Sequence, residues 1–402
     1  MVKETTKNIS AVGEKCTGCG ACSHICHKGC ITMQSNEEGF LYPHVNEGCN
    51  DCGLCQMKCP QLKDTVKQDF HQIGYIGITK DRTVYKSAAS GGVFGTLAKA
   101  FLSQKKAFAC GACFTDGKVR HRIVSDAKDI SLLQNSKYVQ SDLEQVYPQI
   151  KDIIARGGRV LFCGTPCQVD GLYSFLGSRP ASLFTIDLIC HGVPSPAFLD
   201  LDLQKYESKE NIENVVFRWK NPHYKHTKGS YFLSIHRKGR KVKKVFSSSF
   251  DTYFACFMRN ESFRLSCYDC KYVNLNRYGD ITIGDCDSSS YYPHFYSEYS
   301  RSTIIINNEH GQELWKENAS LFNFQPLNLE REASCNHQLS YPAPKPQRRN
   351  EIYSDIATMS QTQLERKYCK KYTLKHKILG FNVYFLQYFL SSCVCDMVAM
   401  SL

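Results

Sequence analysis

Eight cysteines between Cys16 and Cys59 constrain this chain more than any other feature. They form two runs of the pattern C-x-x-C-x-x-C-x-x-x-C: Cys16, Cys19, Cys22 and Cys26, then Cys49, Cys52, Cys55 and Cys59. Soft thiolates suit iron–sulfur clusters, and three cysteines at these short spacings can bind three corners of one cubane. The repeated run therefore predicts two 4Fe-4S clusters.

The order of the cysteines also predicts how the two clusters share them, because the fourth cysteine of a two-cluster ferredoxin run binds the cluster of the other run. One set would be Cys16, Cys19, Cys22 and Cys59, and the other Cys49, Cys52, Cys55 and Cys26. Structural zinc is the competing interpretation, but zinc has no use for a third and fourth cysteine at this spacing. His27 replaces the usual proline after the first run, whereas Pro60 keeps it after the second. The spacer 31–45 alternates and predicts a short hairpin.

Composition narrows the class of protein further. A chain of 402 residues with 42% hydrophobic residues is long enough for two or three domains. Its 22 cysteines follow a polar N-terminus without a secretion signal, so we expect reduced thiols and a cytoplasmic location. The net charge of +12 comes without a nucleic-acid motif, and the basic run 236–244 is expected to be a hairpin tip. An acidic electron carrier or a phosphorylated cofactor fits this charge best.

The segment after the cysteine runs predicts a strand and then a helix joined by small residues. Ile73–Thr79 is typical of a strand, and Ser90, Gly91 and Gly92 precede apolar residues at helical spacing that begin with Val93. Free backbone amides at such a helix start can bind a phosphate or a flavin ring. Many such turns merely start helices, so this signal is weak when taken alone.

Two later strand–turn–helix units carry further cysteines. A buried strand leads to Gly164, Thr165 and Pro166, and Cys167 then opens a helix whose dipole would favour its thiolate. A second strand ends at Cys190 and His191, and a C-x-x-C pair follows at Cys267 and Cys270. We expect Cys167, Cys190, Cys267 and Cys270 to bind a third 4Fe-4S cluster at the carboxyl ends of parallel strands. Cys163 is the rival ligand, and the alternative is that these thiols are buried and inert.

Several motifs in register give the chain a family resemblance. SAASGGVF, FCGTPCQVDGL, DLICHGVPSP, the CYDC pair and DITIGD, after a double ferredoxin run, resemble the coenzyme F420 hydrogenase/dehydrogenase beta subunit family. The resemblance implies an α/β core that binds FAD and one 4Fe-4S cluster and moves hydride to or from a deazaflavin or related acceptor. Carried over by motif, the flavin-binding residues are Ser87, Ser90, Gly91, Gly92, Val93, Phe94, Gly164, Thr165, Pro166 and Gln168. The first motif has one alanine more than the commoner SASGG.

We therefore expect a multidomain α+β and α/β fold. A two-cluster ferredoxin module (1–65) precedes an α/β flavoprotein core with β-rich additions (72–150 and 151–335), and a linker with a helical tail (336–402) ends the chain. The apolar stretch 378–402 contains polar interruptions and predicts a docked or interfacial helix rather than a membrane span.

The expected function is that of an iron–sulfur flavoprotein oxidoreductase. Electrons would pass between the clusters and FAD, with hydride transfer to or from coenzyme F420 or another organic acceptor, and His191 is the candidate proton donor. The alternative is a non-catalytic electron-transfer subunit of a larger redox complex, which the family resemblance links to polysaccharide biosynthesis. The expected partner is a redox protein or a small electron carrier, with homo- and hetero-oligomers both open, and neither nucleic acid nor a membrane span is expected.

Overall fold

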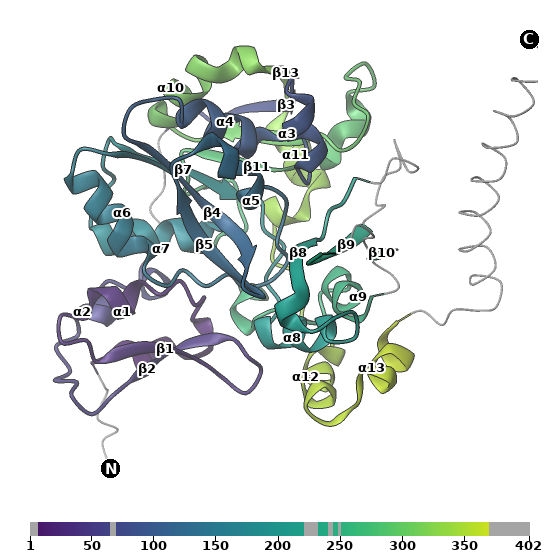
Figure 1. Cartoon of the computed structure of the whole chain (residues 1–402). Coiled ribbons are helices and arrows are strands. Elements are labelled where there is room, and N and C mark those ends of the chain that lie inside the picture. Colours follow the sequence, from purple (N-terminus) through teal and green to yellow (C-terminus); the bar gives the residue numbers. More distant parts are fainter. Residues whose placement is uncertain (1–6, 65–69, 221–231, 240–243, 248–250, 370–402) are drawn as a thin grey trace, which may run out of the picture.

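Residues 7–64, 70–220, 232–239, 244–247 and 251–369 are described by the structure, a computed structural model of the chain (Figure 1). The expected C-terminal helix at 378–402 and the tip of the basic hairpin at 240–243 lie outside these residues. Among the described helices, none is both long and apolar enough to cross a bilayer.

The N-terminal module repeats one backbone turn in its two cysteine runs. Its elements are η1 (Ile9–Lys15), α1 (Ala21–Ile25), β1 (Ile31–Ser35), β2 (Leu41–Val45), α2 (Leu54–Met57) and η2 (Pro60–Leu62). Strands β1 and β2 pair antiparallel, so the predicted hairpin is confirmed. Gly20 and Gly53 precede α1 and α2 with φ angles of 74° and 77°. Glycine adopts this conformation without strain, which lets each run turn sharply between its second and third cysteines.

A mixed sheet of eight strands forms the centre of the remaining chain (Figure 1). Its order is β13-β3-β12-β11-β7-β6-β4-β5, in which the neighbours β4, β6, β7 and β11 pair parallel and all other pairs are antiparallel. The strands are β3 (Ile73–Thr79), β4 (Ala107–Thr115), β5 (Lys118–Val124), β6 (Arg159–Gly164), β7 (Leu183–Leu188), β11 (Ile281–Asp285), β12 (Ser302–Ile306) and β13 (Phe322–Pro326). The expected core segments 72–150 and 151–335 therefore share one sheet.

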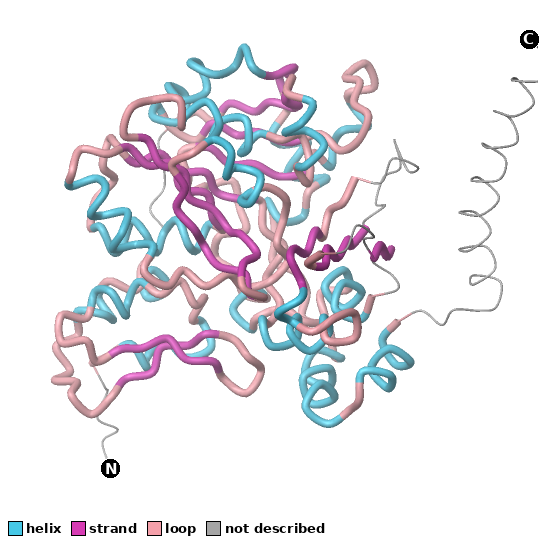
Figure 2. Tube along the Cα trace, viewed as in Figure 1, coloured by secondary structure: helices cyan, strands magenta, loops and turns pink. Residues whose placement is uncertain are grey.

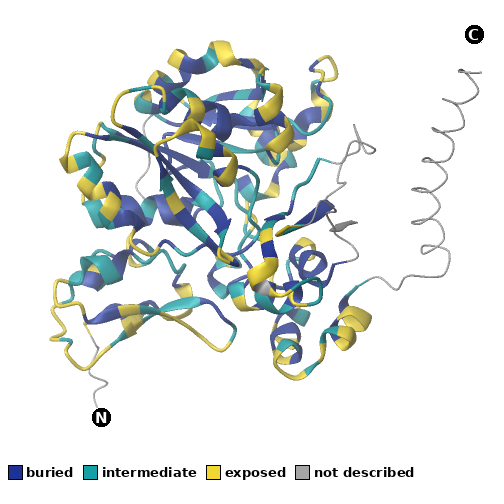
Figure 3. Ribbon diagram, in the orientation of Figure 1, coloured by how far each residue is buried: buried dark blue, intermediate teal, exposed yellow. Residues whose placement is uncertain are grey.

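Helices cover both faces of this sheet because its strands alternate between two apolar cores. On β6, Leu161 packs on the side of α4 (Val93–Phe101) and α10 (Glu309–Asn318), whereas Val160 and Phe162 pack on the side of α6 (Val146–Ala155) and α7 (Pro166–Leu176). The strands are accordingly buried along most of their length (Figure 3). The remaining helices of this region are α3 (Arg82–Ser87), η3 (Ala127–Asp129), α5 (Ile130–Leu133), η7 (Asp287–Tyr291), η8 (Ala319–Leu321), α11 (Leu329–Cys335) and η9 (His337–Leu339).

A second, three-stranded sheet extends the core at one side (Figure 2). It has the order β10-β9-β8, and β9 and β10 pair antiparallel, as the segments flanking the basic run predict. Its strands and neighbouring helices are β8 (Ile212–Val216), β9 (Phe232–Arg237), β10 (Lys244–Ser247), α8 (Pro196–Leu203), η4 (Lys209–Asn211), α9 (Thr252–Met258), η6 (Leu265–Cys267), α12 (Arg348–Thr358) and α13 (Gln361–Tyr368). Ile352 of α12 and Leu364 of α13 are buried in the core that α8 and α9 share. The expected linker and tail thus pack on the domain up to residue 369.

The N-terminal module contacts the core through α1, which lies against α7. Gly171 on α7 makes this contact close, because a Cβ atom at that position would lie 2.9 Å from Cβ of Cys19. On the hairpin side, the buried guanidinium of Arg349 pairs with the carboxylate of Glu38. The cysteines of the module are therefore held at a fixed place beside the sheet.

Candidate functional site

The two cysteine runs surround two separate cavities in the N-terminal module. One cavity is lined by Cys16, Cys19, Cys22 and Cys59. The other is lined by Cys26, Cys49, Cys52 and Cys55. These are the two sets expected from the exchanged fourth cysteine, although ligation itself stays a prediction. We call the set with Cys16 the inner set and the set with Cys49 the outer set.

The inner thiols are crowded enough to oppose their own ionisation. Burial, with the neighbouring Cys16 and Cys59, raises the pKa of Cys22 to about 12. Burial, with the neighbouring Cys22, also raises the pKa of Cys19 well above its usual value. Four thiolates can share such a site only when a strongly positive centre offsets their charge, which iron does in a cubane. The inner set therefore fits the predicted cluster. In the outer set, by contrast, Cys52 is exposed at the surface.

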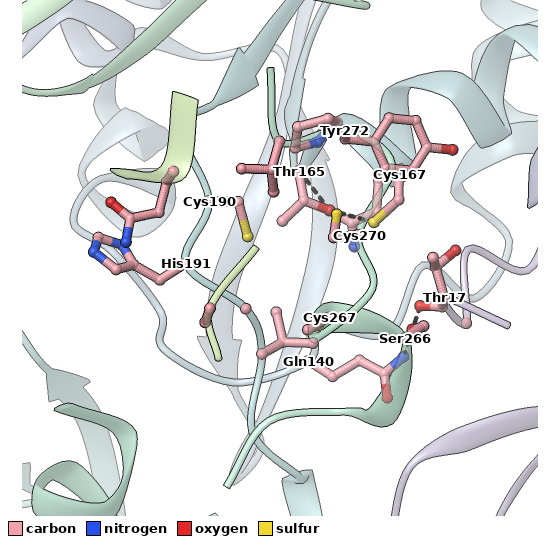
Figure 4. Close-up of a pocket in the computed structure, with 18 of the residues that line it drawn as sticks. Thr17, Gln140, Thr165, Cys167, Cys190, His191, Ser266, Cys267, Cys270 and Tyr272 are labelled. Carbon is pink, nitrogen blue, oxygen red and sulfur yellow. Dashed lines mark hydrogen bonds between the residues drawn. The ribbon is translucent and has the colours of Figure 1, made fainter. Parts of the chain in front are cut away.

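A third cavity lies in the core and is lined by the predicted core cysteines (Figure 4). Cys167 stands in the first turn of α7, Cys190 follows β7, and Cys267 and Cys270 lie in and after η6. The structure thus brings together four thiols from three distant segments, and we call them the core set. Among the described residues, no three His, Cys, Asp or Glu side chains are grouped so as to hold a single metal ion.

Cys163, the rival ligand, faces away from the core set. It occupies the position on β6 that points toward α4, and it lines a different and larger cavity. Burial raises the pKa of its thiol to about 12, and Asp187 adds to this effect. Cys163 faces the α4 side of β6, whereas the chain turns after Gly164 into α7 on the other face, so Cys163 is separated from Cys167 although only three residues stand between them.

The thiols of the core set have raised pKa values because they are buried together. Burial, with Cys167 and Cys270, raises the pKa of Cys190 to about 12, and burial with Cys167 raises that of Cys270 to about 11. The helix start was expected to favour the thiolate of Cys167. Instead, burial raises the pKa of this thiol, and the hydrogen bond with Oγ1 of Thr165 and the charge of Arg264 offset only part of the increase.

The larger cavity has a volume of about 260 Å³ and shares a wall with the cavity of the core set. The residues that line both cavities are Thr165, Gln168, Cys190, His191, Gly192 and Val193. They belong to the loops that follow β6 and β7 and to the first turn of α7, a region where ligands bind in open α/β sheets. We call this space the substrate-side cavity.

Most residues predicted to bind flavin line the substrate-side cavity. They are Ser90, Gly92, Val93, Phe94, Gly164, Thr165 and Gln168. Ser87 and Gly91 lie next to these residues but do not line the cavity. Oγ of Ser87 donates to Oε1 of Gln134, and the amide of Gly91 donates to Oγ of Ser302. Pro166 lines the cavity of the core set instead. Contact with a flavin remains a prediction for the whole group.

His191 lies at the boundary between the two cavities. Its side chain is exposed to the two cavities and is otherwise surrounded by protein. The surrounding protein lowers the pKa of the imidazole because it disfavours the charged form, and Asp285 opposes this effect. The ring is therefore mostly neutral at pH 7. A neutral imidazole can accept a proton in this place more readily than it can supply one.

Lys137 is a charged residue of the substrate-side cavity that the sequence motifs did not reveal. Its ammonium donates to the carbonyl oxygens of Leu132 and Asn135 at 3.2 Å each and also to that of Gln134. Burial lowers its pKa to about 8. No motif surrounds this residue, and only the fold brings its loop to the ends of the parallel strands.

His121 and Arg218 are two further polar residues of this cavity that come from outside the recognised motifs. Nδ1 of His121 and Oγ of Ser141 are 3.0 Å apart, and Ser141 accepts from Nε2 of Gln168. Nη1 of Arg218 donates to Oδ2 of Asp285 at 2.7 Å. Asp285 ends the DITIGD motif, so the recognised motif supplies the anion and an unrecognised segment supplies the cation.

The inner and outer sets define an iron–sulfur protein, and the core set adds four thiols beside a cavity at the sheet edge. Residues 15–62 match the 4Fe-4S dicluster domain, and residues 157–329 match the family described as the C terminus of the beta subunit of coenzyme F420 hydrogenase/dehydrogenase. The chain thus carries a dicluster domain ahead of a region of the F420 hydrogenase/dehydrogenase beta subunit family, and the family expected from the sequence is confirmed.

Two individual proteins are also similar to parts of the chain. An uncharacterized ferredoxin of Methanocaldococcus jannaschii is 40% identical over 47 residues, which span 12% of this chain and 61% of the ferredoxin. A structure of the F420-reducing [NiFe] hydrogenase complex from Methanosarcina barkeri, derivatised with xenon, aligns with a TM-score of 0.45 at 17% identity. That alignment covers 68% of this chain and 94% of the hydrogenase chain.

Proposed function

We propose that the protein is an iron–sulfur flavoprotein oxidoreductase that exchanges electrons between three 4Fe-4S clusters and FAD. Hydride then passes to or from coenzyme F420 or another organic acceptor. The observation that carries this proposal is the wall of six residues shared by the core set and the substrate-side cavity. A cluster and an organic cofactor that filled the two cavities would be neighbours across this wall, which favours direct electron exchange.

The substrate-side cavity fits a flavin in its chemistry. Val93, Phe94 and Ile283 give it apolar surface, and Lys137 and Arg218 give it positive charge. A bound flavin supplies the conversion between single electrons and hydride. Lys137 would stabilise negative charge on the reduced ring, and the loop of Ser90 and Gly92 offers a glycine-rich wall that a ring can approach closely.

The electron balance of the proposed reaction is simple. Two one-electron oxidations of a ferredoxin-type donor and one proton from solvent balance one hydride delivered to the acceptor. In the reverse direction, hydride from the reduced acceptor yields two electrons and one proton. His191, neutral at pH 7, would accept that proton in the reverse direction and return it in the forward direction.

The test is anaerobic purification of the full chain followed by iron, sulfide and flavin analysis. About twelve iron atoms and one FAD per chain are expected. Reduction of F420, and of nicotinamide and flavin acceptors in parallel, by reduced ferredoxin then identifies the acceptor class. Protein with full iron and without bound FAD would contradict the proposal.

A second candidate is a non-catalytic subunit that relays electrons to a partner enzyme, with a link to polysaccharide biosynthesis. The exposed position of Cys52 favours docking of a redox partner and is compatible with both functions. The two candidates differ in the substrate-side cavity, because a relay has no need of it. Stoichiometric FAD and hydride transfer by the isolated chain would exclude the relay.

A further inference from the structure

Arg264 is a fully buried arginine whose backbone belongs to the loops of the core set. Its amide donates to the carbonyl of Val193, three residues after Cys190, and its own carbonyl accepts from the amide of Cys267. The side chain is 0% exposed. The position of Arg264 is therefore fixed by the same two loops that carry three of the core cysteines.

The side chain of Arg264 leaves the core and enters the N-terminal module. Its Nε donates to the carbonyl oxygen of Cys16 at 2.6 Å, and its Nη1 lies 3.4 Å from Oε1 of Gln140. The guanidinium carbon stands 3.9 Å from the ring centre of Tyr42 on the hairpin. One positive charge thus lies between the inner set, which includes Cys16, and the core set.

This charge lacks the partner that other buried arginines have. Arg349 is equally buried and pairs with Glu38, and Arg277 pairs with Asp187. Within the described residues, Arg264 makes no ion pair with a carboxylate, and its Nη2 has no hydrogen-bond partner. Buried charges are normally paired, and the ring of Tyr42 offsets only part of the cost. The missing negative charge must come from another group nearby.

The two neighbouring cysteine sets can supply that negative charge. A 4Fe-4S centre with four thiolates is anionic, and reduction adds one more negative charge. We propose, on the basis of the iron–sulfur function above, that Arg264 is the shared counter-charge of the inner and core centres. It stabilises the reduced form of each and so raises both reduction potentials.

Electron transfer through the chain depends on this arrangement. The guanidinium stabilises the added negative charge on whichever of the two centres is reduced. The contacts of Arg264 reach Cys16 of the inner set and the loops of the core set, so we expect the outer centre to feel less of its charge. Arg264 is therefore a positioning and tuning residue that acts through the centres rather than on a substrate.

The test is a redox titration of the full chain, reconstituted anaerobically and followed by electron paramagnetic resonance. In Arg264→Gln, the ratio of reduced to oxidised centre at a fixed potential should fall by about tenfold for the inner and core centres. This change corresponds to about 59 mV for a one-electron couple. The outer centre should shift less, and Arg264→Lys, which keeps the charge, should restore most of the ratio.

The double variant Arg349→Gln/Glu38→Gln is the matched control, because it removes a buried arginine together with the carboxylate that neutralises it. It should leave the potentials close to those of the wild-type protein. If Arg264→Gln fails to assemble, Gln140→Glu places a carboxylate beside the same guanidinium and should lower the same two potentials.

Three outcomes would overturn the proposal: unchanged potentials in both Arg264→Gln and Gln140→Glu, an equal shift at all three centres, or failure of Arg264→Lys to restore the ratio. Each leaves the proposed function intact, because the centres are then present and measurable. Absence of the centres from wild-type protein would instead contradict the proposed function.

Discussion

The cysteine sets of the N-terminal module and the core set contain the same number of thiols but are assembled in different ways. In the module, each cavity takes three cysteines from one short run, and Gly20 and Gly53 turn the two runs identically. In the core, three loops that are far apart in the sequence bring Cys167, Cys190 and the C-x-x-C pair together. The first arrangement is local, whereas the second exists only when the sheet is complete.

The two arrangements also differ in their access to solvent. Cys52 of the outer set is exposed at the surface, which suits exchange with a carrier that diffuses in. The core set lies behind the wall that it shares with the substrate-side cavity. The outer set is thus open to a partner from solvent, whereas the core set is enclosed beside a cavity.

Replacing Cys267 with serine should have the largest effect. It removes one thiol of the core set and leaves both sets of the module intact. We expect iron to fall from about twelve to about eight atoms per chain, and ferredoxin-dependent reduction of the acceptor to fall by about 100-fold or more. Bound FAD should remain. Iron analysis, flavin absorbance and a stopped-flow assay measure these quantities.

The control for this experiment is Cys163→Ala, which changes a thiol on the other side of β6. It should keep about twelve iron atoms. If Cys163→Ala lost four iron atoms and Cys267→Ser lost none, the assignment of the core set would be wrong.

Replacing Cys52 with serine should have an intermediate effect, because it disturbs the exposed end of the chain of centres. Acceptor reduction by ferredoxin should slow by about 10-fold to 100-fold. Oxidation of the reduced acceptor with a small dye as electron sink should change much less, since a dye can reach the flavin side directly. Equal losses in the two assays would show that the outer centre is not the point of entry.

Protonation of His121 should have the smallest effect, and we measure it through the stability of the fold. Burial lowers the pKa of this imidazole to about 4 from its usual 6.5. The unfolded chain therefore binds the proton more readily than the folded chain. Above pH 6.5 neither state is protonated to a large extent, and the free energy of unfolding has its full value. Below pH 6.5, the free energy of unfolding falls by about 1.4 kcal/mol per pH unit as the pH approaches 4.

The measurement is denaturant unfolding at pH 7 and pH 5.5 for the wild-type protein and His121→Gln. The wild type should lose about 1.2 kcal/mol more than the variant over this interval. His27→Gln, a change at an exposed histidine, should behave like the wild type. The same pH dependence in His121→Gln and the wild type would rule out His121 as its source.

The sequence revealed what depends on neighbours along the chain. The grouping of the module cysteines, the hairpin between them and the start of α7 at Pro166 and Cys167 all follow from short spacings and turn residues. The core set was also found, because a C-x-x-C pair and two strand ends are local signals. Its separation from Cys163 needed the alternation of β6, which places residues two apart on the same face.

Features that depend on distant segments could not be predicted. Lys137 and Arg218 carry no motif, and they reach the substrate-side cavity only through the order of the strands and the loops beside them. The segment before Arg349 was interpreted as a linker because it is rich in proline and basic residues. It leads into helix α12, where Arg349 is buried against the hairpin of the module. Charge composition alone does not distinguish a solvated arginine from a buried and paired one.

The glycine at position 171 bears on the rate of electron transfer in the proposed function. A Cβ atom there would stand 3.0 Å from Sγ of Cys19, so any larger residue would have to displace the cysteine segment before α1. Electron tunnelling weakens exponentially as the donor and acceptor separate. Even a small displacement would therefore slow electron transfer between the proposed inner and core centres. Under the proposed function, a chain with alanine at this position would keep every cysteine and every iron atom and still transfer electrons more slowly.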